Sequence, residues 1–294
     1  MSDFRTRLNS DVPLIMDGAT GTELTRRGLE LTPPLWSASA ILQAPELLQQ
    51  IHRDYVEAGA QLITANTFRT HARNLREAGF LHRAKGLTVR AVEIARTAGT
   101  EKYFVAGSIA PLEDCYSPQL TPSLGELEDE HAAHTEHLAS AGVDCLLVET
   151  QITIREAVIA AKAATDTGLP VLVSFTLAEL PGGARLLSGE PLQEAINAVT
   201  KLEIDGLLLN CIPAEDILPA VAQVTIPSCV ALGAYANTGR LLANGSWVKT
   251  EAVNPAVYAV HAQAWKTSEI KLLGGCCGTT PEHVRQLAKA VYDL

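Results

Sequence analysis

The sequence is short of basic residues and of long apolar runs, and both shortages narrow what the protein can bind. Its 23 Lys and Arg are outnumbered by 33 Asp and Glu, which gives a formal net charge of -10 and a pI near 5.3. Nucleic acids and anionic membranes attract the opposite charge, so neither is expected as a partner. No apolar run reaches the roughly 18 residues of a membrane span, and the polar segment 1–18 lacks the apolar core of a signal peptide. We therefore expect a cytoplasmic protein.

Cysteine is also scarce, with six in 294 residues. That is too few for a disulfide scaffold, and in a reducing compartment clustered cysteines indicate metal ligands or catalytic thiols. Cys115, Cys145 and Cys229 are isolated in the sequence and are expected to be inert. Cys115 differs from the other two because its loop follows a predicted strand and can overhang a site. Cys276 and Cys277 are adjacent, which makes them the candidates for chemistry.

The chain shows no internal repeat, low-complexity tract or Pro/Ser-rich linker that would divide it. Its hydrophobic content of 47 % is ample for a large core, and 21 Gly and 15 Pro do not suggest disorder. Single α/β barrels of this length are common. We therefore expect one domain over residues 1–294.

Eight apolar runs alternate with longer segments of helical period, such as 45–58. Several runs are nearly continuous in Val, Ile and Leu, as is typical of parallel strands buried on both faces. Eight strand–helix pairs in one domain predict an α/β fold of the (β/α)8 TIM-barrel type. The runs cover residues 12–17, 61–66, 103–108, 143–150, 170–176, 206–211, 228–235 and 270–277.

Each of these runs ends in, or just before, a group able to do chemistry. A barrel brings the carboxyl ends of its strands to one mouth, where active sites are built. Polar strand ends can also arise merely because strands meet polar loops, which accounts well for Ser108 and Thr176. This alternative accounts poorly for Cys211 at the end of one run and the pair Cys276-Cys277 at the end of another. The terminal residues are Asp17, Asn66, Ser108, Glu149, Thr176, Cys211, Asn237 and Cys276-Cys277.

The cysteines at the ends of the sixth and eighth runs predict a metal site at the barrel mouth. Cys276 and Cys277 would point to opposite faces of a regular strand, so both reach one ion only if the backbone leaves strand geometry. Three thiolates favour zinc and leave a fourth position open for a substrate. A vicinal disulfide or simple burial of the cysteines are the alternatives. The glycines that permit the departure are Gly274, Gly275 and Gly278.

A second candidate metal motif is HAAHTEH, which contains His131, His134 and His137. On a helix two of these could share an ion. They follow the acidic stretch GELEDEH, so we interpret the motif as the solvated face of a barrel helix.

Several motifs together resemble the homocysteine S-methyltransferase family, over residues 12–291. The pair formed by an upstream Asn-Cys and GGCCGTTPEHV is the most specific, whereas DG-x-x-GT alone would be weak. The loop at 108–125 is not the form found in the best-known members. The motifs are DGATGTEL (17–24), ANTF (65–68), VET (148–150), LNC (209–211), ANTG (236–239) and GGCCGTTPEHV (274–284).

The resemblance implies a zinc-dependent enzyme whose Zn²⁺ is held by the three cysteines and binds homocysteine through sulfur. It implies that Asp17, Gly18 and Glu149 grip the amino acid end of homocysteine. It also implies that Asn237 lies near the metal and can fill the fourth position before substrate arrives. From the residues alone, Asp17 could instead be a turn residue and Glu149 part of a barrel-mouth ion pair.

The methyl donor is indicated only by Trp36 in the loop after the first strand, in a segment similar to S-methylmethionine-using members. A sulfonium or quaternary ammonium is attracted to an indole face, although Trp36 could equally be packing. We therefore expect S-methylmethionine or S-adenosylmethionine as donor. Betaine, methylfolate or a methyl-corrinoid protein as donor, a selenol acceptor, and a non-enzymatic zinc or redox-binding protein are the alternatives. The sequence leaves the oligomeric state open, a homo-oligomer included.

Overall fold

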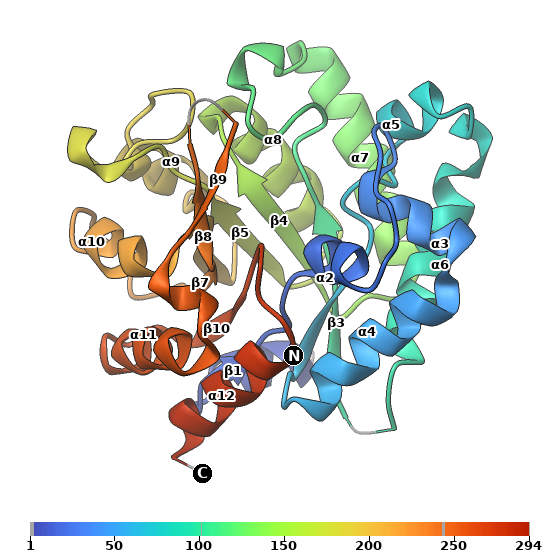
Figure 1. The fold of residues 1–294 in the computed structure, drawn as a ribbon. Coiled ribbons are helices and arrows are strands. Elements are labelled where there is room, and N and C mark those ends of the chain that lie inside the picture. Colours follow the sequence, from blue (N-terminus) through green and yellow to red (C-terminus); the bar gives the residue numbers. More distant parts are fainter. Residues whose placement is uncertain (1–2, 101, 243–244, 294) are drawn as a thin grey trace.

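A closed barrel of parallel strands forms the centre of the molecule (Figure 1). The computed structural model describes residues 3–100, 102–242 and 245–293. Eight of the described strands make one sheet in the spatial order β1-β10-β7-β6-β5-β4-β3-β2. A parallel bridge between Met16 and Leu62 joins the two ends of that sheet. The barrel strands are β1 (Leu14–Ile15), β2 (Leu62–Ala65), β3 (Phe104–Ile109), β4 (Cys145–Gln151), β5 (Val171–Phe175), β6 (Gly206–Pro213), β7 (Ala231–Asn237) and β10 (Leu272–Gly275).

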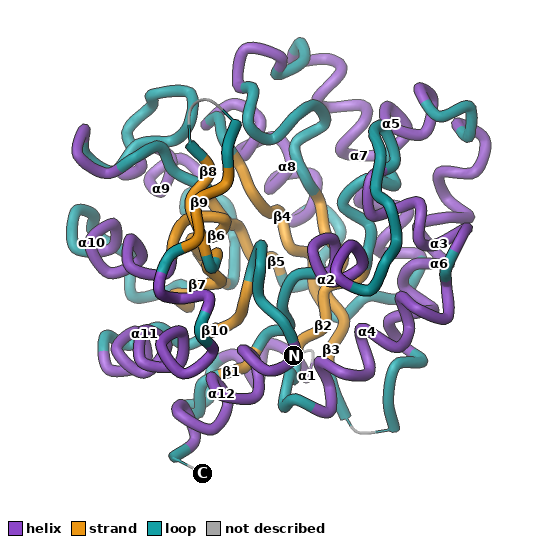
Figure 2. Tube along the Cα trace, in the orientation of Figure 1, coloured by secondary structure: helices purple, strands orange, loops and turns teal. Residues whose placement is uncertain are grey.

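Each barrel strand overlaps one of the eight predicted runs, so the predicted (β/α)8 barrel is confirmed. Helices surround the strands in Figure 2, as this fold requires. They are α1 (Asp3–Leu8), α2 (Thr20–Arg26), α3 (Ala40–Gln43), α4 (Pro45–Glu57), α5 (Ala72–Glu77), α6 (Ala84–Arg96), α7 (Leu124–Ser140), α8 (Ile154–Thr165), α9 (Leu192–Val199), α10 (Ile217–Val221), α11 (Pro255–Thr267) and α12 (Pro281–Tyr292). None of the described helices is both long and apolar enough to cross a bilayer.

The apolar core has two parts, one on each side of the barrel wall. The larger part lies between the strands and the helices, where α4 contributes Leu48, Ile51 and Tyr55. The smaller part fills the barrel interior, and Phe4 and Leu8 of α1 belong to it. Phe4 packs edge-on against Phe104 with ring centroids 5.3 Å apart. The interior below the mouth is therefore solid, and a ligand can enter only from the mouth.

Local signals in the sequence start the helices that carry the barrel-mouth loops. Thr280 caps α12, and Pro281 takes the first helical position, as the sequence predicts. Ser123 and Glu126 form a capping box at α7, in which each side chain bonds to the other's backbone. These caps fix where the loop after β3 ends and where the turn after β10 ends.

A hairpin on the mouth side has no counterpart among the predicted elements. Strands β8 (Gly239–Leu241) and β9 (Trp247–Lys249) pair antiparallel directly after β7. Trp247 packs so closely on Gly239 that a Cβ there would lie 2.6 Å from the indole. The hairpin stands above the barrel next to β7 in Figure 1.

The interpretation of HAAHTEH as a solvated face was wrong. His131 and His134 are 0 % and 2 % exposed, because α7 turns this face toward β3 and α8. His131 Nε2 lies 3.1 Å from a carboxylate oxygen of Glu156, and His134 Nε2 lies 3.3 Å from the carbonyl of Ser108. The one cluster of metal-ligating side chains found among the described residues is the cysteine triad, so these histidines serve packing and hydrogen bonding.

Candidate active site

Three cysteine sulfurs meet at the carboxyl ends of β6 and β10. The Sγ atoms of Cys211, Cys276 and Cys277 all lie within 4.8 Å of one another, and those of Cys211 and Cys276 are 2.7 Å apart. All three cysteines are unpaired and partly buried. Two neighbouring thiols lower the pKa of Cys277 well below its usual value, because they donate hydrogen bonds to its sulfur. The same contacts raise the pKa values of Cys211 and Cys276, so without a metal ion the cluster favours negative charge on the Cys277 sulfur alone.

Irregular backbone at two strand ends brings these sulfurs together. Cys211 has a φ of 54°, in the left-handed region that a side chain rarely adopts, and the β6–β7 register shifts between Asn210 and Pro213. Bulges of this kind redirect side chains near active sites. On the other side β10 stops at Gly275, so Cys276 and Cys277 lie in the turn that follows it.

The three glycines around the cysteine pair have different roles from those expected of them. Only Gly278 uses the left-handed region, with a φ of 85°. Gly274 and Gly275 stay within β10 and are needed for close approach instead. A Cβ on Gly275 would lie 2.4 Å from Thr279 Oγ1, and one on Gly274 would lie 2.6 Å from Met16 Cβ.

Two buried carboxyl groups face the same cavity. Asp17, 4 % exposed, accepts hydrogen bonds from the Thr64 amide (2.8 Å) and hydroxyl (3.0 Å). Glu149, 8 % exposed, accepts from the hydroxyls of Ser108 and Tyr235, the latter at 3.1 Å. Burial raises the pKa of Asp17 to about 8 and that of Glu149 to about 7.

Neither carboxyl group pairs with a cation among the described parts of the chain. The hydroxyl donors around them fix their orientation but do not neutralise them. Such a pair of buried acids is costly unless a positively charged group arrives. The arrangement is suited to bind an ammonium group.

The remaining predicted substrate residues divide into two that line the cavity and one that does not. Gly18 lines it, and a Cβ there would lie 2.8 Å from both Thr279 and Tyr55. Trp36 lines it from the loop after β1, with 36 % of its surface exposed. Asn237 is 1 % exposed and lies behind Cys211, to whose carbonyl its Nδ2 donates at 2.8 Å.

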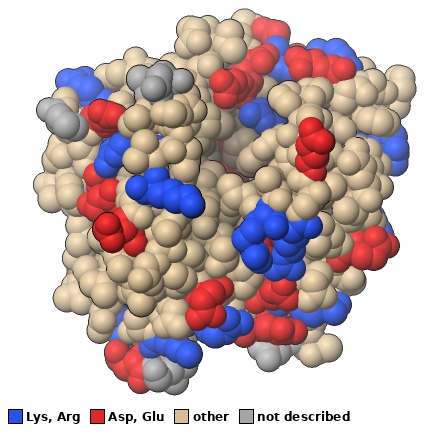
Figure 3. Space-filling model, viewed as in Figure 1, with Lys and Arg blue, Asp and Glu red and all other residues tan. Residues whose placement is uncertain are grey.

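A single cavity of about 560 Å³ connects the cysteine triad with the two carboxyl groups, Gly18 and Trp36. Figure 3 shows the molecule hollowed near the centre of the mouth-side face, with acidic and basic side chains on the rim. The triad, the two carboxyl groups and Trp36 all line the cavity. Trp36 meets Phe68 edge-on, with ring centroids 6.2 Å apart.

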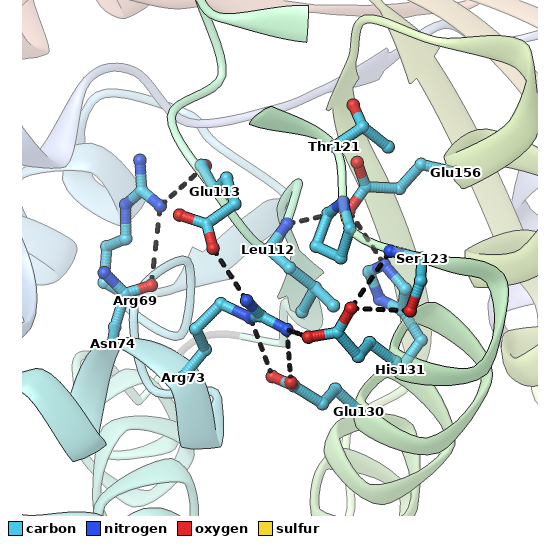
Figure 4. A network of polar contacts seen from close by, with 12 residues as sticks. Arg69, Arg73, Asn74, Leu112, Glu113, Thr121, Ser123, Glu130, His131 and Glu156 are labelled. Atoms are coloured by element: carbon cyan, nitrogen blue, oxygen red, sulfur yellow. Dashed lines mark hydrogen bonds and ion pairs between the residues drawn. The ribbon is translucent and has the colours of Figure 1, made fainter. Parts of the chain in front are cut away.

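The loop after β3, residues 110–123, covers part of this cavity. It places Cys115 and Tyr116 in the cavity wall, although the Cys115 thiol is not part of the triad. Figure 4 shows how the loop is held: Arg73 binds the Glu113 carboxylate at 2.8 Å, and the Leu112 amide donates to Glu156 at 2.8 Å. Arg73 is anchored in turn by carboxylates of α7, at 2.9 Å and 2.7 Å.

Sequence reasoning missed residues that hold the carboxyl groups and two of the aromatic residues that line the cavity. Thr64 and Tyr235 lie within predicted strands, and their inward direction follows only from the barrel register. Phe68 was part of a motif but had no assigned role. Tyr116 belongs to a loop whose path no local pattern predicts.

Fold and site together define a (β/α)8 barrel with a sulfur-rich, metal-competent centre at its mouth. The comparisons with known proteins agree. Residues 14–291 match the family model described as homocysteine S-methyltransferase. The chain is 32 % identical to homocysteine S-methyltransferase of Escherichia coli, over 97 % of both chains. It is 28 % identical to a selenocysteine Se-methyltransferase of Brassica oleracea, over 95 % of this chain and 89 % of the relative.

A solved structure is similar over the same range. The crystal structure of the homocysteine methyltransferase MmuM of Escherichia coli, in its metallated form, superposes with a TM-score of 0.79 and 28 % identity. The match covers 95 % of this chain and 96 % of that one. The chain therefore belongs to the homocysteine S-methyltransferase family, and it is a methyltransferase.

Proposed function

We propose that the protein transfers a methyl group from a small sulfonium donor, S-methylmethionine or S-adenosylmethionine, to the thiol of homocysteine. The product is methionine. The observation that carries this proposal is the sulfur triad beside two uncompensated buried carboxyl groups, in one cavity. We place the reaction in the cytoplasm, because the thiols must stay reduced to act.

The triad fits Zn²⁺ better than any hard cation. Cys211, Cys276 and Cys277 offer three soft sulfur donors within 4.8 Å, and they leave a fourth position for substrate. When bound there, zinc keeps a coordinated substrate thiol deprotonated, which makes it a nucleophile at neutral pH.

The residues around the triad orient homocysteine. Asp17 and Glu149 accept its ammonium group, and that positive charge lowers their raised pKa values so that both ionise. Gly18 keeps the cavity wall free of a side chain at this point. Asn237 supports Cys211 by donating a hydrogen bond to its carbonyl, and the buried Oδ1 of Asn237 has no partner among the described residues.

The aromatic wall is the reason for choosing an onium donor. Trp36, Phe68 and Tyr116 all line the cavity, and aromatic faces attract sulfonium and ammonium groups. Attack of the homocysteine sulfur forms the new S–CH₃ bond while the donor's S–CH₃ bond breaks. The donor's bonding electrons stay on its sulfur, which leaves as a neutral thioether. Holding both substrates in line supplies much of the acceleration.

Other donors and acceptors fit the site less well. Betaine shares the onium chemistry and is the nearest alternative donor. A methyl-corrinoid protein needs an open mouth, whereas the loop at 110–123 narrows this one. Methylfolate lacks a fixed positive charge for the aromatic wall. A selenol acceptor is favoured by one observation, the similarity to the selenocysteine Se-methyltransferase.

A donor panel with zinc-loaded enzyme tests the proposal. We expect methionine from homocysteine with S-methylmethionine or S-adenosylmethionine, measured by mass spectrometry. No product with either donor would refute the assignment. Cys276→Ser should lose zinc and activity together, while Cys229→Ser, an exposed cysteine outside the triad, should keep both. Full activity in Cys276→Ser would remove the proposed role of the triad.

A further inference from the structure

Arg69 is a cavity-lining cation without an acidic partner. It follows Phe68 in the loop after β2, and its guanidinium lies over the Phe68 ring, 5.1 Å from the centroid. One terminal nitrogen, Nη1, donates to the Glu113 carbonyl at 3.0 Å and to the Asn74 side-chain oxygen at 3.4 Å. Both acceptors are neutral. Among the described residues no ion pair engages Arg69, and Nε and Nη2 have no partner.

The neighbouring Arg73 shows that the shortage of acids is local to Arg69. Arg73 lines the same cavity and pairs with three carboxylates, from Glu113, Glu126 and Glu130. Figure 4 shows Arg73 between Glu113 and Glu130, with Arg69 at the side of the group and one of its nitrogens pointing away from it. Glu113, whose backbone carbonyl accepts from Arg69, therefore already has its carboxylate paired with Arg73.

The other cavity acids do not neutralise Arg69 either. Asp17, Glu77, Asp114 and Glu149 also line the cavity, and none of them forms an ion pair with Arg69 among the described residues. Asp17 and Glu149 are held by hydroxyl and amide donors at the inner end. Asp114 accepts from the Tyr116 amide and the Ser117 hydroxyl. An arginine whose position is fixed by an aromatic face and a backbone carbonyl, with two donor groups free, is prepared for a carboxylate ligand.

We infer that Arg69 binds the carboxylate of the methyl donor, with the donor's onium group against Trp36 and Phe68. This inference rests on the proposed function and narrows it: the donor class is a small onium carboxylate. The three side chains are in continuous contact, because the Trp36 ring packs edge-on against the Phe68 ring and the Arg69 guanidinium lies over the Phe68 ring. The inner acids select the ammonium of homocysteine, and the outer cation selects the acid group of the donor.

The test compares S-methylmethionine with its decarboxylated analogue, (3-aminopropyl)dimethylsulfonium, on the zinc-loaded enzyme. Wild type should use the analogue with a kcat/KM lower by about 10- to 100-fold, the value of a charge-assisted hydrogen-bond pair. Arg69→Gln should lower kcat/KM for S-methylmethionine by the same factor and abolish the discrimination between the two donors. The KM for homocysteine should not change.

Arg76→Gln is the matched control, since Arg76 is exposed on nearby α5 and does not line the cavity. It should leave all constants unchanged. Arg69→Lys should retain part of the discrimination. Equal use of both donors by wild type would overturn the inference, whether or not the Arg69 variants fold. A higher KM for homocysteine alone in Arg69→Gln would also overturn it, because Arg69 would then serve the acceptor.

The outcome separates this inference from the proposed function. Methyl transfer without discrimination refutes only the role of Arg69. An absence of methyl transfer from every onium donor refutes the donor assignment and the inference together.

Discussion

Replacing Glu149 with Gln should change stability and substrate binding in opposite directions. Burial raises the pKa of Glu149 from 4.5 to about 7. Between these two pH values the folded protein therefore keeps a proton on Glu149 that the unfolded chain has released. For an acid whose folded pKa is the higher one, stability falls as pH rises between the two values. At 1.36 kcal/mol per pKa unit, ionised Glu149 costs the metal-free protein about 3 kcal/mol above neutral pH.

Glu149→Gln removes that cost while keeping the hydrogen-bonding shape of the group. The difference in free energy of unfolding between variant and wild type should be near zero below pH 4.5. It should rise to about 3 kcal/mol in favour of the variant at about pH 8. Urea denaturation of the reduced, chelated proteins at several pH values measures it. Glu136→Gln, an exposed change on α7, is the control and should show no such rise.

The same substitution should weaken homocysteine binding, because a neutral amide no longer pairs with the ammonium group. The loss of a charge-assisted hydrogen bond predicts a KM for homocysteine higher by about 10- to 100-fold. The donor KM should stay unchanged. A variant that is less stable than wild type at pH 8, or that keeps its homocysteine KM, would refute the reasoning that this acid is held ready for a cation.

Three further substitutions test the parts that support the site. Arg73→Ala should destabilise the protein by roughly 1–3 kcal/mol and speed proteolysis of the loop at 110–123, because Glu113 loses its partner; unchanged cleavage would contradict the anchoring role. Gly278→Ala should cost about 2–4 kcal/mol and weaken zinc binding in a metal titration, since its φ is 85° and its Cβ would lie 2.0 Å from Thr238 Oγ1; wild-type stability would show that the turn can relax. His52→Leu should reduce acid sensitivity: burial lowers the pKa of His52 to about 4, so wild type loses up to about 3 kcal/mol as pH falls from about 6.5 to about 4, and the variant does not. An equal fall in the free energy of unfolding of variant and wild type between pH 7 and pH 4.5 would contradict this.

The histidine motif shows where a local pattern gives the wrong surface. GELEDEH suggested a solvated helix face, yet two of its acids, Glu126 and Glu130, bind Arg73, and His131 and His134 turn inward. Helical period specifies which residues share a face. It does not specify which face meets the barrel, because that depends on how α7 packs on β3 and α8.

The sequence by itself determined the barrel and the chemistry of its centre. Continuous apolar runs require strands buried on both faces, and eight of them with helices between close into a barrel whose strand ends share one mouth. Strand order alone therefore brings Cys211 and Cys276, which are 65 positions apart, to the same mouth, together with Cys277.

Only the tertiary structure decided the orientation of the site's side chains and the residues that surround them. The left-handed φ of Cys211, the hydroxyls that hold Asp17 and Glu149, and the unpaired charge of Arg69 all arise from contacts between distant segments. No local propensity encodes them, because each depends on a neighbour that the barrel register supplies. The physical reason is that strand periodicity determines which side of the barrel wall a side chain points to, whereas its burial and its charged neighbours depend on the packing of the whole domain.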